Sequence, residues 1–178
     1  APHFPFVVPE PYFSMYYPEN CDLPLNTIEK QAQITKSQKN LIQAFGFSGY
    51  SDDDIMRARA AYYGLITFLD DKIGNLVSSL SKNGLDRDTV IVYTSDHGES
   101  LGEHGLWRKM NFYEESVRVP LQISWPEVLP QNKRCSSVVS LVDLTSTIID
   151  LSGYSLDEQK NWSLDGDTLL PLIMGSDK

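Results

Sequence analysis

Residues 90–121, VIVYTSDHGESLGEHGLWRKMNFYEESVRVPL, decide the fold of this chain. The stretch begins with an apolar, β-branched run that stops abruptly at Ser95-Asp96-His97-Gly98. A short apolar run that ends in glycine-rich sequence is typical of a buried strand in an α/β sheet, and ligands gather at the carboxyl ends of such strands. We therefore expect Asp96 and His97 at that edge of the sheet, as an oxygen donor and a nitrogen donor.

A basic pair, Arg108 and Lys109, follows one loop later. Carboxylate, imidazole and ammonium groups close together suit metal-assisted attack on an anionic ester. A carboxylate suits Ca²⁺ or Mg²⁺ and an imidazole suits Zn²⁺ or Mn²⁺, so Asp96 and His97 do not identify their metal. The simpler alternatives are a capping Asp96, a hydrogen-bonded structural His97 and a solvated Lys109. The position of the pair after a strand favours a ligand or catalytic role.

The composition indicates a globular protein. The chain has 178 residues, of which 41% are hydrophobic and 22% are charged, as in one ordinary domain. A formal net charge of -9 and the lack of a Lys/Arg cluster argue against a nucleic-acid partner. No apolar run reaches membrane-spanning length, so we expect no membrane span. The two cysteines, Cys21 and Cys135, do not identify a compartment, and Asn161 begins a single glycosylation sequon.

Residues 1–50 are predicted to form an extended Pro/aromatic segment followed by a connector. Proline is too dense in residues 1–26 for a regular helix, and the connector has room for one short helix. From the local sequence, His3 is interpreted as a surface histidine of this segment. Asp70 and Asp71 could be a metal pair, but the solvated face of the next helix is the simpler place for them. Glu99, Glu103, Glu114 and Glu115 are most simply solvated, although Glu103 or His104 could line the pocket.

Residues 51–178 are predicted to form the α/β part. Ser51 and the three aspartates after it mark a helix start, and apolar residues recur every three or four positions until Asn83-Gly84. The remaining expected elements are the strand into Asp96, a strand at 120–125, an extended piece at 137–140, a helix at 141–151 ended by Gly153, a polar loop at 154–166 and an apolar run at 168–174. Alternating helices and strands indicate α/β with a largely parallel sheet.

Several motifs, in their order and spacing, resemble the sulfatase family, within the alkaline-phosphatase-like superfamily, over nearly the whole chain. They are Pro2-His3-Phe4-Pro5 with Val8-Pro9-Glu10-Pro11-Tyr12, Tyr62-Tyr63-Gly64, Leu69-Asp70-Asp71-Lys72-Ile73-Gly74, Thr94-Ser95-Asp96-His97-Gly98, Gly102-Glu103-His104-Gly105-Leu106-Trp107-Arg108-Lys109, Tyr113-Glu114-Glu115-Ser116-Val117-Arg118-Val119-Pro120-Leu121, Val142-Asp143-Leu144 and Asp165-Gly166. The fold implied is a mostly parallel sheet flanked by helices, incomplete at both ends.

The resemblance also implies roles for four residues. Asp96 and His97 look like the second half of a Ca²⁺ site, with Mg²⁺, Mn²⁺ and Zn²⁺ as open alternatives. Lys109 looks like the lysine that contacts the sulfate and the leaving oxygen. His3 looks like the histidine that binds sulfate and helps to protonate the leaving group, which reverses the local interpretation of His3.

This sequence departs from the family pattern in two respects. Many sulfatases carry Asn where this chain has His97. The Cys-x-Pro-x-Arg motif, whose Cys or Ser becomes the formylglycine nucleophile, is not in the sequence, nor are the aspartate pair that begins the metal site and its upstream lysine and histidine partners. Because the chain starts at Ala1 and stops at Lys178 without a closing element, we expect a partial sulfatase domain that is inactive alone and works with the remainder of its polypeptide.

The resemblance implies hydrolysis of an organic sulfate ester by the complete enzyme. The substrate would be a sulfated small molecule or glycan, and the location periplasmic, secreted or lysosomal. Two alternatives stay open: a metal-dependent phosphodiesterase or phosphonate monoester hydrolase of the same superfamily, and a non-catalytic relative that binds sulfated glycan.

Overall fold

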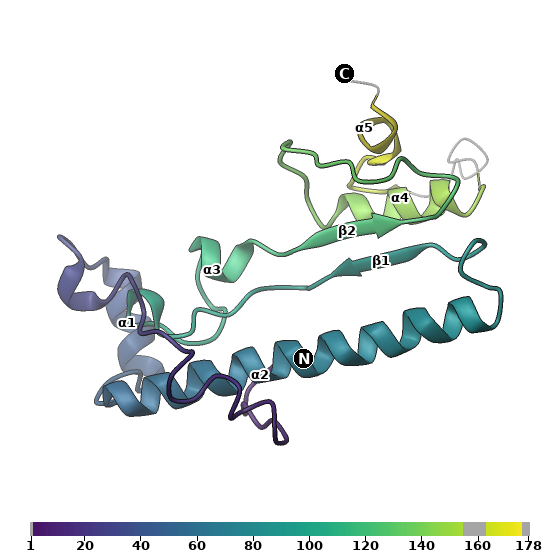
Figure 1. Cartoon of the computed structure of the whole chain (residues 1–178). Helices are drawn as coiled ribbons and strands as arrows, with labels where there is room; N and C mark the ends of the chain where they lie inside the picture. The colour runs from purple at the N-terminus through teal and green to yellow at the C-terminus, as the bar shows by residue number, and fades with distance from the viewer. Residues whose placement is uncertain (1, 155–162, 176–178) are drawn as a thin grey trace. The chain divides into compact units, whose positions relative to one another are not determined.

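The computed structural model describes residues 2–154 and 163–175, and they form two compact units (Figure 1). The first unit comprises Ala1–Lys82 and His97–Pro120, and the second comprises Asn83–Asp96 and Leu121–Lys178. The chain therefore passes from the first unit to the second, returns to the first, and ends in the second.

The main element of the first unit is helix α2, Asp52–Lys82. Ser51 begins it with a reciprocal cap: Asp54 N–H donates to Ser51 Oγ at 3.1 Å, and Ser51 N–H donates to Asp54 Oδ2 at 3.0 Å. The helix ends before Gly84, whose φ of 68° lies in the left-handed region. The predicted long helix is confirmed. Within the described residues, neither α2 nor any other helix has the length and apolar character to cross a bilayer.

The predicted connector contains the 3₁₀ helix η1, Ile28–Lys30, and the helix α1, Lys36–Phe45. Thr35 caps α1, because its Oγ1 accepts from Gln38 N–H at 3.1 Å. Gly46 ends the helix with a φ of 65°. The expected short helix of the connector is thus α1.

Residues 2–24, here called the N-terminal arm, lie along α2 in the first unit without forming a helix or strand (Figure 1). Turns occupy residues 10–20. Tyrosine hydroxyls attach the arm to α2: Tyr12 to Asp71, Tyr16 to Thr67 and Tyr17 to Asp53, each at 2.6 Å. At Gly64 the helix approaches the arm so closely that a Cβ would lie 2.7 Å from the Tyr12 carbonyl oxygen. The arm is therefore an ordered part of this unit.

The second unit contains strands β1, Ile91–Thr94, and β2, Leu121–Ser124, at the predicted positions. They pair antiparallel, with Thr94 opposite Leu121 and Ile91 opposite Ser124. The expected largely parallel sheet is therefore not what these strands form. A parallel pair of strands needs a crossover connection that carries the chain back to the start of the first strand. Here β2 instead begins beside the residue where β1 ends. The intervening residues include only the 3₁₀ helix η2, Glu103–Gly105, and the one-turn helix α3, Glu114–Val117.

Helices α4, Asp143–Leu151, and α5, Leu170–Met174, complete the second unit. Leu169 N–H donates to Thr147 Oγ1 at 2.8 Å and so joins them. The predicted helix at 141–151 and its end near Gly153, with a φ of 81°, are confirmed. Residues 137–140 form no strand, the apolar run at 168–174 is mostly helical, and much of the predicted loop at 154–166, with Asn161, lies outside the described residues.

Candidate anion-binding site

The first unit brings together two predicted site residues that are 106 positions apart, since His3 Nε2 lies 2.6 Å from Lys109 Nζ. The other ring nitrogen of His3, Nδ1, is 2.8 Å from the Phe4 carbonyl oxygen. A carbonyl oxygen only accepts, so Nδ1 carries the proton and donates it. Nε2 then holds the lone pair that accepts from the Lys109 ammonium group. His3 is exposed, so this pair can be reached from solution.

The Phe4 ring contacts both the histidine and the basic pair of the loop. Its ring stacks with the His3 ring at a centroid distance of 4.4 Å and an interplanar angle of 29°. Arg108 Cζ lies 4.1 Å from the centroid of the same ring, and Lys109 Nζ lies 5.7 Å from it. One aromatic ring thus contacts an imidazole and two cations.

The backbone around Arg108 and Lys109 is fixed by hydrogen bonds. Arg108 has a φ of 70°, its N–H donates to the Glu99 carboxylate, and its carbonyl accepts from Ser100 N–H at 2.9 Å and Ser100 Oγ at 2.7 Å. Ser116 Oγ donates to the Lys109 carbonyl at 2.7 Å. Because Ser100 is only 2% exposed, these bonds are shielded from water. Glu99, expected to be solvated, is instead part of this support.

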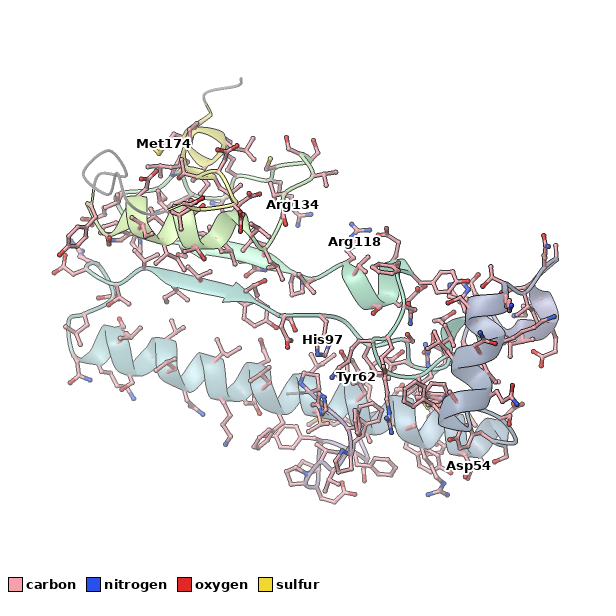
Figure 2. All side chains as sticks on the ribbon, turned by 180° about the vertical axis from the view of Figure 1, so that it is seen from behind. Asp54, Tyr62, His97, Arg118, Arg134 and Met174 are labelled. Carbon is pink, nitrogen blue, oxygen red and sulfur yellow. The ribbon has the colours of Figure 1, made fainter. Side chains whose placement is uncertain are left out.

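His97 follows the strand and belongs to the first unit (Figure 2). Its Nδ1 donates to the Gly98 carbonyl at 2.8 Å, so the lone pair is on Nε2, the tautomer that suits metal ligation through Nε2. The His97 and His3 ring centroids are 6.2 Å apart. Gly98 N–H donates to the Ser116 carbonyl at 2.8 Å, and a Cβ on Gly98 would collide with the Glu115 carbonyl. His97 is therefore positioned by a backbone contact that only glycine permits.

Asp96 ends the segment that contains β1, and the boundary between the two units falls between Asp96 and His97. Ser95 Oγ donates to Asp96 Oδ1 at 3.4 Å. The described part of the chain contains no group of three or more His, Cys, Asp or Glu side chains arranged to hold a metal ion. A carboxylate and an imidazole with its lone pair on Nε2 fit part of a divalent-cation site, with further ligands still needed.

The sequence did not predict that one arginine of α2 is buried. Arg59 is 5% exposed and donates to the Leu101 carbonyl at 2.9 Å and to Asp22 Oδ1 at 3.0 Å. Its Nη1 also lies 3.5 Å from Glu103 Oε1, whose side chain accepts from the Leu25 and Asn26 N–H groups at 3.1 and 2.8 Å. The expectation of a solvated Glu103 is wrong, because Glu103 is 8% exposed. The one available signal was the position of Arg59 beside Ala60 and Ala61 on the buried face of α2.

These contacts change the acidity of two groups. Burial, together with the hydrogen bond to Asp22, raises the pKa of Tyr63 to about 12. Burial would raise the pKa of Asp22, but the hydrogen bonds from Arg59 and Tyr63 and the Arg59 charge outweigh burial and hold the pKa below its ordinary value. Asp22 thus remains a carboxylate that links the arm to α2.

His104, which could have lined a pocket, is a structural residue in this unit. Its ring stacks on Tyr113 at 3.8 Å, and its Nε2 lies 3.5 Å from Glu115 Oε2. Its carbonyl accepts from the Gln38 amide at 2.7 Å, and its φ is 57°. These contacts join η2 to α1 and α3 and leave His3 and Lys109 as the solvent-accessible pair.

Comparisons with known proteins match this chain to sulfatases and to a phosphonate monoester hydrolase. The sulfatase family model matches residues 1–154. The choline-sulfatase of Rhizobium meliloti (strain 1021) is 35% identical over 99% of this chain and 34% of its own length. The phosphonate monoester hydrolase SpPMH from Silicibacter pomeroyi has a TM-score of 0.83 and 29% identity over 99% of this chain and 36% of its own. BT4656, solved in complex with its substrate D-glucosamine-2-N,6-O-disulfate, has a TM-score of 0.64 and 28% identity over 79% of this chain and 28% of its own.

The chain spans about a third of the length of the choline-sulfatase and of SpPMH. Its likeness to solved hydrolases of the alkaline-phosphatase-like superfamily, with a TM-score of 0.83 for SpPMH, confirms the predicted α/β architecture as part of a larger domain. The family model covers the arm with His3, the Asp96-His97 turn and the loop with Lys109. The chain belongs to the sulfatase family.

Proposed function

We propose that this chain forms part of a metal-dependent hydrolase of organic sulfate esters and that His3 and Lys109 are catalytic residues of that enzyme. The observation that carries the proposal is the 2.6 Å contact between Lys109 Nζ and His3 Nε2. An ammonium group that donates to a neutral imidazole presents one positive charge and one transferable proton at the same place. Membership of the sulfatase family supports the choice of ester.

The pair would act on the substrate in two ways. The Lys109 charge attracts the sulfate oxygens and stabilises the negative charge that grows on the leaving oxygen as the bond between sulfur and that oxygen breaks. The proton held between Nζ and Nε2 passes to the leaving oxygen, so that an alcohol departs and not an alkoxide. The Phe4 carbonyl accepts from Nδ1 throughout, which keeps Nε2 directed to the proton transfer.

Asp96 and His97 would hold a divalent cation, for which we propose Ca²⁺, with Mg²⁺, Mn²⁺ and Zn²⁺ as alternatives. A dication bound there would supply Lewis-acid neutralisation of the sulfate oxygens. The formylglycine nucleophile and the remaining metal ligands are proposed to belong to the rest of the polypeptide. We propose accordingly that this chain alone does not turn over sulfate esters.

A sulfated small molecule or a sulfated glycan is the proposed substrate class. The names of the choline-sulfatase and of the structure bound to a disulfated glucosamine support the two members of that class. We also propose a periplasmic, secreted or lysosomal location.

The likeness to SpPMH favours a second candidate function, phosphonate monoester hydrolysis. A phosphonate monoester is also a tetrahedral monoanion, so the same ammonium–imidazole pair could bind and protonate it.

The test is to express the complete protein that contains this chain and to compare release of 4-nitrophenol from a sulfate ester and from a phosphonate monoester. Lys109→Met and His3→Ala should each lower kcat for the better substrate by ~10²–10³-fold. Lys72→Met is the matched control, since Lys72 is an exposed lysine of α2 whose Nζ lies 4.7 Å from the Phe68 ring centroid.

Each outcome has a clear meaning. Sulfate release lost with Lys109 or His3 but not with Lys72 supports the proposal. Faster cleavage of the phosphonate would favour the second candidate. A Lys109→Met enzyme that keeps the wild-type kcat would overturn the role of the pair, and sulfate release by the isolated chain would overturn its proposed inactivity.

A further inference from the structure

The Arg108 guanidinium is surrounded by aromatic rings, although Arg108 is the neighbour of Lys109. Its Cζ lies 4.1 Å from the Phe4 ring centroid, 5.5 Å from that of Phe45 and 5.9 Å from that of Phe47. A cation over aromatic faces is attracted by their quadrupoles, and guanidinium suits this role because it is planar and weakly hydrated. These contacts direct the Arg108 charge to the rings, whereas Lys109 Nζ reaches His3.

Phe4 in turn controls His3 through two separate contacts. Its ring stacks with the imidazole at 4.4 Å, and its carbonyl accepts from Nδ1 at 2.8 Å. The stack sets the plane of the imidazole, and the hydrogen bond sets its tautomer. If Phe4 moved, both constraints on His3 would be lost together.

We propose that Arg108 is a positioning residue, one that holds Phe4 so that Phe4 keeps His3 in the orientation and tautomer that meet Lys109. This inference rests on the proposed function of the His3–Lys109 pair and adds to it a residue that does not itself contact the substrate. The left-handed φ of 70° at Arg108 is consistent with the role, because Arg108 and Lys109 are consecutive and yet both approach the ring of Phe4.

The alternative role for Arg108 is direct binding of the anion, and the two roles predict different kinetics. A lost anion ligand weakens substrate binding and raises KM. A misplaced imidazole leaves binding nearly intact and lowers kcat, by ~10- to 100-fold for a displacement of about 1 Å. Three aromatic rings around the guanidinium favour the second pattern.

The kinetic test is a double-mutant cycle in the complete protein, with Arg108→Gln, Phe4→Leu and both together. Since Arg108 acts through Phe4, each single variant should lower kcat ~10- to 100-fold with little change in KM, and the double variant should be no worse than Phe4→Leu alone. Arg57→Met is the matched control: its Cζ lies 4.4 Å from the Tyr17 ring centroid, and it should keep the wild-type kcat. Additive effects, or a raised KM with an unchanged kcat, would overturn the proposal.

A second readout does not depend on turnover. Two-bond ¹H–¹⁵N spectra of histidine-labelled complete protein report which ring nitrogen of His3 carries the proton. The wild-type protein should show a protonated Nδ1, and Arg108→Gln should show a mixture of tautomers. An unchanged tautomer in Arg108→Gln contradicts the proposal even if the complete protein proves to cleave neither ester.

Arg108→Lys covers the case in which Arg108→Gln does not fold. Lysine keeps the charge but not the planar guanidinium, so it should lower kcat less and in the same way. A wild-type kcat in both Arg108→Lys and Phe4→Leu would overturn the role of the stack. If the tautomer shifts as expected while sulfate release is absent, the proposed function fails and the positioning role of Arg108 stands.

Discussion

Two glycines of α2 test whether the N-terminal arm lies where the structure places it. Gly64 is buried, and a Cβ there would lie 2.7 Å from the Tyr12 carbonyl oxygen and 3.0 Å from its carbon. Gly74 is exposed on the same helix, and a Cβ there would have nothing within 4 Å. Both are helical positions, so Gly64→Ala and Gly74→Ala differ chiefly in the contact with the arm.

The relative sizes of the helix-propensity gain and the packing cost decide whether each substitution raises or lowers the free energy of unfolding. Alanine is favoured over glycine inside a helix by ~1 kcal/mol, so Gly74→Ala should raise the free energy of unfolding by about that amount. Gly64→Ala has the same gain, but its Cβ must displace the backbone at Tyr12, and overpacking of this kind costs ~1–3 kcal/mol. We therefore expect Gly64→Ala to be less stable than Gly74→Ala by ~1–3 kcal/mol.

Thermal unfolding followed by far-UV circular dichroism measures this difference. For a chain of this size, 1 kcal/mol corresponds to a shift of ~2–4 °C in Tm. Gly74→Ala should raise Tm, and the Tm of Gly64→Ala should lie several degrees below that of Gly74→Ala. Because the arm carries His3, Gly64→Ala should also lower kcat of the complete protein. Equal stabilisation by both substitutions would refute the close approach of the arm to α2.

Two further predictions concern the charged groups between the arm and α2. Arg59→Met should lower the free energy of unfolding, measured in urea, by ~3 kcal/mol, because Glu103 then stays buried without its cation. The control Arg57→Met breaks an exposed ion pair that is worth at most ~1 kcal/mol. Equal losses of stability in the two variants would contradict the burial of Arg59. The pKa of Tyr63 is raised from 10.0 to about 12, so the stability it contributes is complete below pH 10 and is lost as the pH rises towards 12. Tyr63→Phe should therefore lose less Tm than the wild type between about pH 9 and about pH 11, and parallel losses would refute the raised pKa.

Local sequence patterns predicted the elements whose causes are local. Helix α2 has an apolar repeat along its length, with a Ser51 cap before it and a glycine shortly after it, and its bounds were predicted closely. The β1 strand and its glycine-rich end were equally visible. The antiparallel pairing was not, because the direction of β2 depends on how residues 95–120 return to the sheet.

Local sequence patterns predicted even less of the candidate site than of the fold. The partner of His3 is 106 positions away, so local sequence could only describe a surface histidine, and family resemblance had to supply its relation to Lys109. Arg59 and Glu103 carry charges that usually indicate solvent, and only the fold reveals that each is buried against the other. The metal-binding roles proposed for Asp96 and His97 stay a prediction.

Because His3 lies on the arm and Lys109 lies 106 positions away in the sequence, the site depends on the attachment of the arm. The arm is attached to α2 largely by side-chain hydrogen bonds and aromatic contacts, many of them exposed, whereas α2 has its own backbone ladder. Such a segment can open by local fluctuation at a lower free energy than global unfolding. Amide hydrogens of residues 12–20 should then exchange faster than those in the middle of α2, and binding of an anion at His3 should slow them. Occupancy of the site would thus be reported by the protection of residues 12–20, a part of the arm that does not include His3.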